Sequence, residues 1–265
     1  RLFDQARTCF LAASSNVETA DSITAMDNVA YIINAAEMYD KAAAVYEKTL
    51  GMWKALEGVS EDRLQTAYAN LAIALTNAGY LKEAISTWEE LLDHLAKVPG
   101  GMGTDDAALV YQRLARLYYS VDRQQKAIKS YDTAIFIVEK NHGKGYDYTA
   151  TLLTNRGYVY HDMGQLDKAL ADFEEAYGIV KATQGEESAD AANLLVGIGG
   201  VYAKESKHSI AFDNYDKAVK ILEGLGEKAR PDLAVAYNSI ASSLQAYGDY
   251  ATALGYFEKA LEIEK

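Results

Sequence analysis

Asparagine recurs in the sequence at positions where its side chains could bind an extended peptide. Asn28, Asn70 and Asn155 occupy one place in a repeating pattern, and Arg113 takes that place between Asn70 and Asn155, at spacings of 42, 43 and 42 residues. A primary amide both donates and accepts hydrogen bonds, so a series of amides can hold peptide N–H and C=O groups without reading side chains. Arg113 and Arg116 lie one helical turn apart, and this spacing predicts that they select an acidic side chain or carboxylate of a ligand.

Two other features could suggest a phosphate or metal site, but neither has the sequence surroundings that such a site requires. Gly197-Ile198-Gly199-Gly200 resembles a phosphate-binding loop, but such a loop follows a strand and opens a helix, whereas this one lies inside a helical pattern. We interpret Gly199 as a close helix contact. The histidines lack metal-ligand spacing, so no metal is predicted. They are His94, His142, His161 and His208.

No set of side chains has the spacing of a nucleophile with its base or of an acid–base pair, so we predict a non-enzymatic protein without a cofactor. The net charge of −12 argues against nucleic acid or an anionic membrane as the main partner. One cysteine, Cys9, excludes an internal disulfide, and the sequence contains no signal peptide or apolar span of membrane length. A soluble cytoplasmic protein without direct membrane insertion is therefore expected.

The elements that position the asparagines follow from a repeat. Alanine recurs at spacings of 42, 43, 42, 42 and 42 residues, and an aromatic residue stands four positions after each alanine. The alanines are Ala42, Ala84, Ala127, Ala169, Ala211 and Ala253, and the aromatics are Tyr46, Trp88, Tyr131, Phe173, Tyr215 and Phe257. A fixed period in this range indicates a solenoid, in which each unit buries its apolar face against a neighbour.

Small residues also stand twelve positions before each of these alanines and indicate helices packed close together. They are Ala30, Ala72, Ala115, Gly157, Gly199 and Ala241. Each repeat is predicted to consist of a first helix, A, and a second helix, B. The repeats are placed at about 21–57, 61–97, 104–141, 146–183, 187–225 and 230–265, after a half repeat at 1–16. Thr104 or Asp105 is expected to cap the third A helix, and Pro231 fits the first turn of the sixth.

This pattern resembles the tetratricopeptide repeat, in which A and B helices carry small and large residues in a fixed order. The sixth repeat has this order as Tyr237, Ile240, Ala241, Leu244, Gly248, Ala253, Phe257 and Ala260. The length is similar to the 42-residue repeat of kinesin light chains. The resemblance implies an all-α fold, a right-handed superhelical solenoid of about six helix pairs plus the N-terminal half repeat, as a single domain over 1–265.

In this family the A helices line a concave groove, and the resemblance therefore assigns the candidate site. The predicted peptide-binding residues are Asn28, Tyr31, Asn70, Arg113, Arg116, Asn155, Tyr158, Asn193 and Asn238. Among the groove positions only Asp27, Arg113, Arg116, Asp162 and Lys204 are charged, and their charges sum to +1. A nearly neutral groove on an acidic protein is expected. The lysines of a carboxylate clamp for chaperone C-termini are missing, so that function is disfavoured.

Three positions depart from the repeat pattern. Asp122 and Ser206 replace the glycine of the turn between the A and B helices. Arg156 stands where an A helix has an apolar residue, and two interpretations are open. In the favoured one its stem packs while its head reaches water, and in the other the head reaches an acidic residue across the repeat interface.

The sequence therefore predicts a scaffold or adaptor that binds a partner peptide or helix in the groove, with an acidic residue as a possible feature of the ligand. One alternative is a sensor or regulatory segment of a larger signalling protein, since the chain begins half a repeat in and ends on an uncovered B helix. Another is a homo-oligomer that assembles through these uncapped ends, where Leu254, Phe257 and Leu261 lie.

Overall fold

The computed structural model describes residues 19–263, which form helices joined by short turns and contain no strand. The all-α prediction is confirmed for these residues. The predicted half repeat at 1–16, with Cys9, lies outside the described residues.

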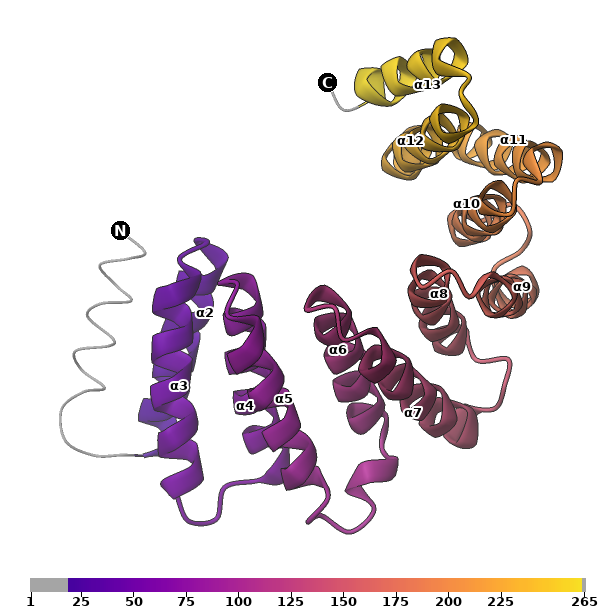
Figure 1. Cartoon of the computed structure of the whole chain (residues 1–265). Coiled ribbons are helices and arrows are strands. Elements are labelled where there is room, and N and C mark those ends of the chain that lie inside the picture. Colours follow the sequence, from indigo (N-terminus) through magenta and orange to yellow (C-terminus); the bar gives the residue numbers. More distant parts are fainter. Residues whose placement is uncertain (1–18, 264–265) are drawn as a thin grey trace. The chain divides into compact units, whose positions relative to one another are not determined.

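The chain divides into two compact units, residues 1–123 and 124–265. In the described part of unit 1, each helix packs against the next along the chain (Figure 1). These helices are α2 (Ala20–Ala35), α3 (Tyr39–Ala55), α4 (Glu61–Asn77), α5 (Leu81–Leu95), the short 3-10 helix η1 (Gly101–Gly103) and α6 (Asp105–Ser120).

Unit 2 has the same arrangement of successive antiparallel helix pairs (Figure 1). Its helices are α7 (Gln124–His142), α8 (Asp147–Asp162), α9 (Leu166–Thr183), α10 (Ala189–Lys204), α11 (His208–Leu225), the 3-10 helix η2 (Gly226–Ala229), α12 (Arg230–Tyr247) and α13 (Tyr250–Ile263). The A helices also touch one another, since α10 contacts both α8 and α12. The boundary between the units falls at the turn between α6 and α7, inside the third repeat, and the single domain over 1–265 stays a prediction.

Side chains at the helix ends explain where several helices begin. The Thr104 hydroxyl accepts a hydrogen bond from the N–H of Ala107 at 3.2 Å, so Thr104 rather than Asp105 caps α6. Ser188 caps α10 in the same way through the N–H of Ala191. Pro231 lies in the first turn of α12, as predicted, where its missing N–H has no helical partner to lose.

The turns between A and B helices require a left-handed backbone. Gly79, Gly164 and Gly248 occupy this position with φ of 84°, 72° and 94°. The other three repeats have non-glycine residues at the same position. These are Glu37, Asp122 and Ser206, with φ of 60°, 58° and 62°. A side chain costs about 1–2 kcal/mol in this conformation, so these three turns are strained relative to the glycine turns.

The repeated alanines and aromatics form the core, as the pattern predicts. All six alanines are buried, and five of the six aromatics are buried with them. Phe257 is the exception: it is 37% exposed on α13. Leu254 and Leu261 on the same helix are 59% and 53% exposed.

Gly157 and Gly199 allow the aromatic ring of the following B helix to approach the A helix. A Cβ atom on Gly157 would lie 2.8 Å from Cε1 of Phe173, and one on Gly199 would lie 2.6 Å from Cε1 of Tyr215. Such distances are too short for carbon atoms, so the ring fills the space that a side chain would need. The interpretation of Gly199 as a close helix contact is confirmed.

The favoured interpretation of Arg156 is wrong. Its guanidinium group donates to both carboxylate oxygens of Asp172 on α9, at 2.8 Å and 2.7 Å, and to Asp132 on α7 at 2.6 Å. The side chain of Arg156 is 18% exposed and that of Asp172 is 7% exposed. The head therefore reaches acidic residues, one of them across the repeat interface, because the buried carboxylate of Asp172 needs a charged donor.

Candidate functional site

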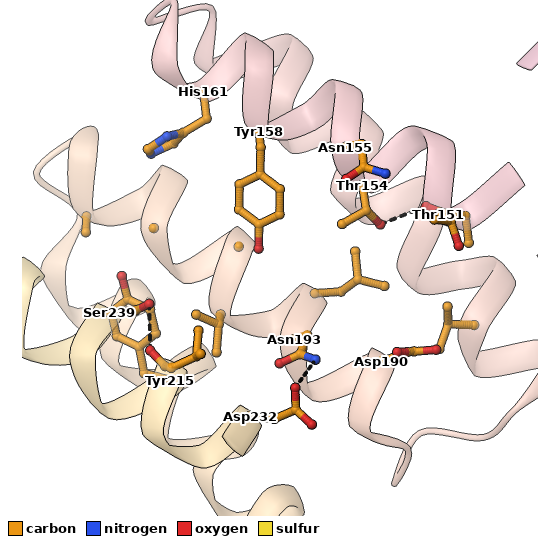
Figure 2. A pocket seen from close by; sticks show the side chains of 18 of the residues that line it. Thr151, Thr154, Asn155, Tyr158, His161, Asp190, Asn193, Tyr215, Asp232 and Ser239 are labelled. Carbon is orange, nitrogen blue, oxygen red and sulfur yellow. Dashed lines mark hydrogen bonds between the residues drawn. The ribbon is translucent and has the colours of Figure 1, made fainter. Parts of the chain in front are cut away.

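A cavity of about 840 Å³ opens on the A-helix face of unit 2. Residues of α8, α10 and α12 form its walls. Val180 in the last turn of α9, Gln184 directly after that helix and Tyr215 of α11 complete the lining. We call this cavity the unit 2 pocket. Figure 2 shows the side chains of α8 facing those of α10 and α12 across it.

The three A helices that line the unit 2 pocket run in the same direction. Asn193 in the first half of α10 donates to Asp232 in the first turn of α12 at 3.1 Å. At the other end, the ammonium group of Lys204 donates to the carbonyl oxygen of His161 near the end of α8 at 2.8 Å. Equivalent positions of successive repeats therefore lie side by side along the unit 2 pocket.

Two of the predicted amides line the unit 2 pocket. The Asn155 amide makes no hydrogen bond to any other described residue, so its donor and acceptor are both available. The Asn193 amide donates its N–H to Asp232, which holds the side chain in one orientation and leaves its oxygen available (Figure 2). These two amides can bind a peptide backbone at adjacent points.

An aromatic ring and a glycine shape the middle of the unit 2 pocket. Tyr158 packs edge-on against Phe173, with 5.0 Å between ring centroids, yet it is 42% exposed and lines the pocket. Desolvation raises the pKa of its phenol, which stays a neutral donor. On α10, Gly200 leaves a hollow, since a Cβ there would have no neighbour closer than 3.9 Å. The hollow leaves room for a side chain of a ligand.

Most hydroxyl groups around the unit 2 pocket donate to their own helix. Thr154 donates to the carbonyl oxygen of Ala150 at 2.7 Å, and Ser239 donates to that of Val235 at 3.0 Å. Ser242 donates to the carbonyl oxygen of Asn238 at 2.8 Å. The hydroxyl oxygens can therefore accept, but their protons are already used.

Four aspartates line the unit 2 pocket, and the sequence analysis had placed only one of them, Asp162, in the groove. Asp147, Asp190 and Asp232 lie in the first turns of α8, α10 and α12, and Asp162 ends α8. The prediction of a nearly neutral groove is therefore wrong for this pocket. The sequence does contain a pattern that could have indicated them, because an aspartate stands nine or ten positions before the small residue of these repeats. That pattern is equally typical of an ordinary helix start.

The remaining predicted residues lie elsewhere. Asn238 is half-buried on α12 and does not line the unit 2 pocket, although its neighbour Ser239 does. In unit 1, Asn28 and Arg116 are exposed, Asn70 and Arg113 are half-buried, and Tyr31 is 68% exposed. Neither Arg113 nor Arg116 has an ion-pair partner among the described residues. These five residues stay predictions for the A-helix face of unit 1.

Within residues 19–263, no group of three or more His, Cys, Asp or Glu side chains has a geometry that could hold a metal ion. Nor is any helix in this part of the chain both long and apolar enough to cross a membrane.

Comparisons with known proteins identify the fold. A family model described as tetratricopeptide repeat matches residues 106–182, 148–224 and 190–265. The structure is similar to BtubC (BKLC) from P. vanneervenii, with 22% identity, 85% of this chain and 91% of that chain covered, and a TM-score of 0.70. It is also similar to a P. anserina putative kinesin light chain with nearly identical TPR-like repeats, with 18% identity, coverage of 79% and 97%, and a TM-score of 0.63.

A third similar structure is the Rap conjugation gene regulator of the plasmid pLS20 in complex with the Phr* peptide. It has 15% identity, coverage of 95% of this chain and 77% of that chain, and a TM-score of 0.54. No curated protein matches the sequence.

Proposed function

Since the chain belongs to the tetratricopeptide repeat family, with repeats of the kinesin light chain type, we propose that it is an adaptor that binds an extended segment of a partner protein in the unit 2 pocket. The repeats and the structural neighbours indicate a protein-interaction or regulatory repeat domain. The adaptor has no catalytic step or cofactor of its own and acts in the cytoplasm.

The observation that carries this proposal is the combination of free amide groups and unfilled space on one face of the A helices. The side-chain amides of Asn155 and Asn193 can form hydrogen bonds with the backbone of a ligand, and the ring of Tyr158 offers an apolar surface that ends in a hydroxyl group. The cavity of about 840 Å³ has the size of sites that enclose a ligand. The Rap conjugation gene regulator, whose structure is similar, was solved in complex with the Phr* peptide, which supports peptide binding by the fold here.

The proposal is tested by filling the hollow above Gly200. Dodecapeptides selected from a random phage-displayed library against the full chain serve as probes. We expect Gly200→Leu to weaken their binding at least tenfold, because the leucine side chain occupies the unit 2 pocket while its Cβ meets nothing closer than 3.9 Å. Fluorescence anisotropy measures the affinity, and circular dichroism checks that the helices are retained.

Gly178→Leu is the matched control. Gly178 lies on the exposed side of α9, where a Cβ meets nothing within 4 Å, so the same side chain is added outside the unit 2 pocket. Equal affinities of the two variants for the selected peptides would overturn the proposed site.

A further inference from the structure

We propose that the unit 2 pocket selects a basic segment, in which a lysine or arginine side chain lies against Asp190 and Asp232. This inference rests on the proposed function and specifies the chemistry of the partner. Figure 2 shows both carboxylates beside Asn193, on the side of the pocket opposite Asn155 and Tyr158.

The charges around the unit 2 pocket favour a cationic ligand. Its lining contains four aspartates, and against them stand one lysine and one histidine. The ammonium group of Lys204 already donates to the carbonyl oxygen of His161, and Asp162 lies 3.1 Å from Nδ1 of His161. The two basic groups therefore lie at the end of α8, whereas the charged residues that line the pocket from the first turns of the A helices are all aspartates.

The hydrogen-bonding capacity of the lining points the same way. Thr154, Ser239 and Ser242 donate their hydroxyl protons to their own helices, and the Asn193 amide donates to Asp232. The oxygens of these groups remain able to accept. A lining rich in acceptors is matched by a ligand rich in donors, and lysine and arginine carry three and five donor hydrogens without an acceptor.

The individual carboxylates differ in their freedom to bind a ligand. Asp147 accepts hydrogen bonds from Thr183 at 2.9 Å and from Gln184 at 3.0 Å, so its role is to hold the end of α9. Asp232 accepts only from Asn193, and the carboxylate of Asp190 has no hydrogen bond or ion pair with any described residue. Asp190 and Asp232 are therefore the two that a ligand can engage.

Helix stabilisation does not by itself explain these two residues. An aspartate in a first turn favours the helix through its dipole on whichever side it points. Asp190 and Asp232 stand on adjacent parallel helices, and both line the same cavity, as Asp147 does. A cation bound in this cavity is attracted by both carboxylates at once, whereas each helix dipole acts only on its own aspartate.

The test uses the random dodecapeptide library and the full chain. We expect the selected peptides to be enriched in lysine and arginine, and Gly200→Leu to block them. The double variant Asp190→Asn with Asp232→Asn keeps the shape and the acceptor for Asn193, and is expected to weaken binding about tenfold. Asp213→Asn, at an exposed position of α11 away from the unit 2 pocket, is the matched control and should leave the affinity unchanged.

The outcomes separate this inference from the proposed function. Peptides that are neutral or acidic but blocked by Gly200→Leu would overturn the basic selectivity and leave the pocket as the binding site. Basic peptides that bind the double aspartate variant as tightly as the unchanged chain would also overturn it. Failure to select any peptide, or selection of peptides that Gly200→Leu does not affect, would overturn both.

Discussion

The A-helix faces of the two units differ in charge at two positions that the repeat makes equivalent. Arg113 in unit 1 takes the place that Asn155 has in unit 2, and Arg116 takes that of Tyr158. The charged residues that line the unit 2 pocket are mostly aspartates, which stand at other positions of the repeat. Packing restricts the buried positions of a repeat, but it leaves the positions facing solvent free to differ. We therefore expect unit 1 to favour acidic segments and unit 2 to favour basic ones.

A second difference between the units concerns a core position. Leu71 on α4 and Thr87 on α5 are buried in unit 1, at the places that Arg156 and Asp172 take in unit 2. A buried ion pair has to offset the loss of hydration of both charges, which an apolar pair avoids. The pKa of Asp172 is raised, chiefly by burial, although the contact with Arg156 lowers it, so the charged carboxylate remains disfavoured at this position.

Among the predicted effects, replacement of this core pair is expected to change the stability of the protein most. Arg156→Leu leaves the Asp172 carboxylate buried without a donor and should cost about 3–5 kcal/mol of the free energy of unfolding. The double variant Arg156→Leu with Asp172→Thr reproduces the pair at Leu71 and Thr87 and should regain most of that loss. Hydrogen exchange of α8 and α9 measures both, and a double variant no more stable than the single one would contradict the account.

The small-residue position gives the next largest effect. Unit 1 has Ala72 and Ala115 where unit 2 has Gly199, but a Cβ at Gly199 would lie 2.6 Å from Tyr215 and 3.1 Å from the carbonyl oxygen of Ala211. We expect Gly199→Ala to destabilise unit 2 by about 1–3 kcal/mol, because the ring has to move. Thermal unfolding followed by circular dichroism measures it.

Gly200→Ala is the control for that substitution. Gly200 lies in the same helix turn and has space for a Cβ, so its replacement by alanine should stabilise the helix by about 0.8–1 kcal/mol. If both variants shifted the unfolding temperature in the same direction, helix propensity rather than ring packing would govern this position.

The turns between A and B helices should behave alike in both units. Ser206→Gly removes a side chain from a left-handed turn and should stabilise by about 1 kcal/mol, and Glu37→Gly should do the same in unit 1. Gly164→Ser should have the opposite effect of similar size. Urea denaturation of the three variants checks the signs, and a destabilised Ser206→Gly variant would show that the serine side chain stabilises the turn.

The smallest expected effect tests the charge of unit 1. Arg113→Glu should weaken the binding of a glutamate-containing dodecapeptide selected from the library by about threefold, as befits a partly exposed charge. Asn70→Ala should weaken the binding of acidic and neutral peptides alike, since the Asn70 amide is predicted to form hydrogen bonds with the peptide backbone. If Arg113→Glu leaves the affinity for acidic peptides unchanged, the two faces do not differ in the way their charges suggest.

The repeat in the sequence predicted the helices well, because each buried column packs against the same kind of neighbour in every repeat. The observed helices begin and end within a few residues of the predicted ones, and the cap at Thr104, the packing of Gly199 and the left-handed turns at Asp122 and Ser206 follow from it. Glu37 occupies the same turn position and was detectable by the same register.

The partners of polar side chains were predicted less well. Arg156 was expected to extend into water, but it pairs with residues 16 and 24 positions away on two different B helices. A period along the chain reports which way a side chain points from its own helix. It does not report which charged group the next helix brings within 3 Å.

The sequence by itself determined the fold family, the order of helix pairs and the buried columns, because these depend on local spacing repeated many times. Only the tertiary structure decided that Asn155 and Asn193 face one cavity, that Gly200 opens it and that Asp190 and Asp232 line it. Those residues belong to three helices, and their meeting depends on how closely parallel A helices approach each other. That approach is set by side chains of the whole interface rather than by any single repeat.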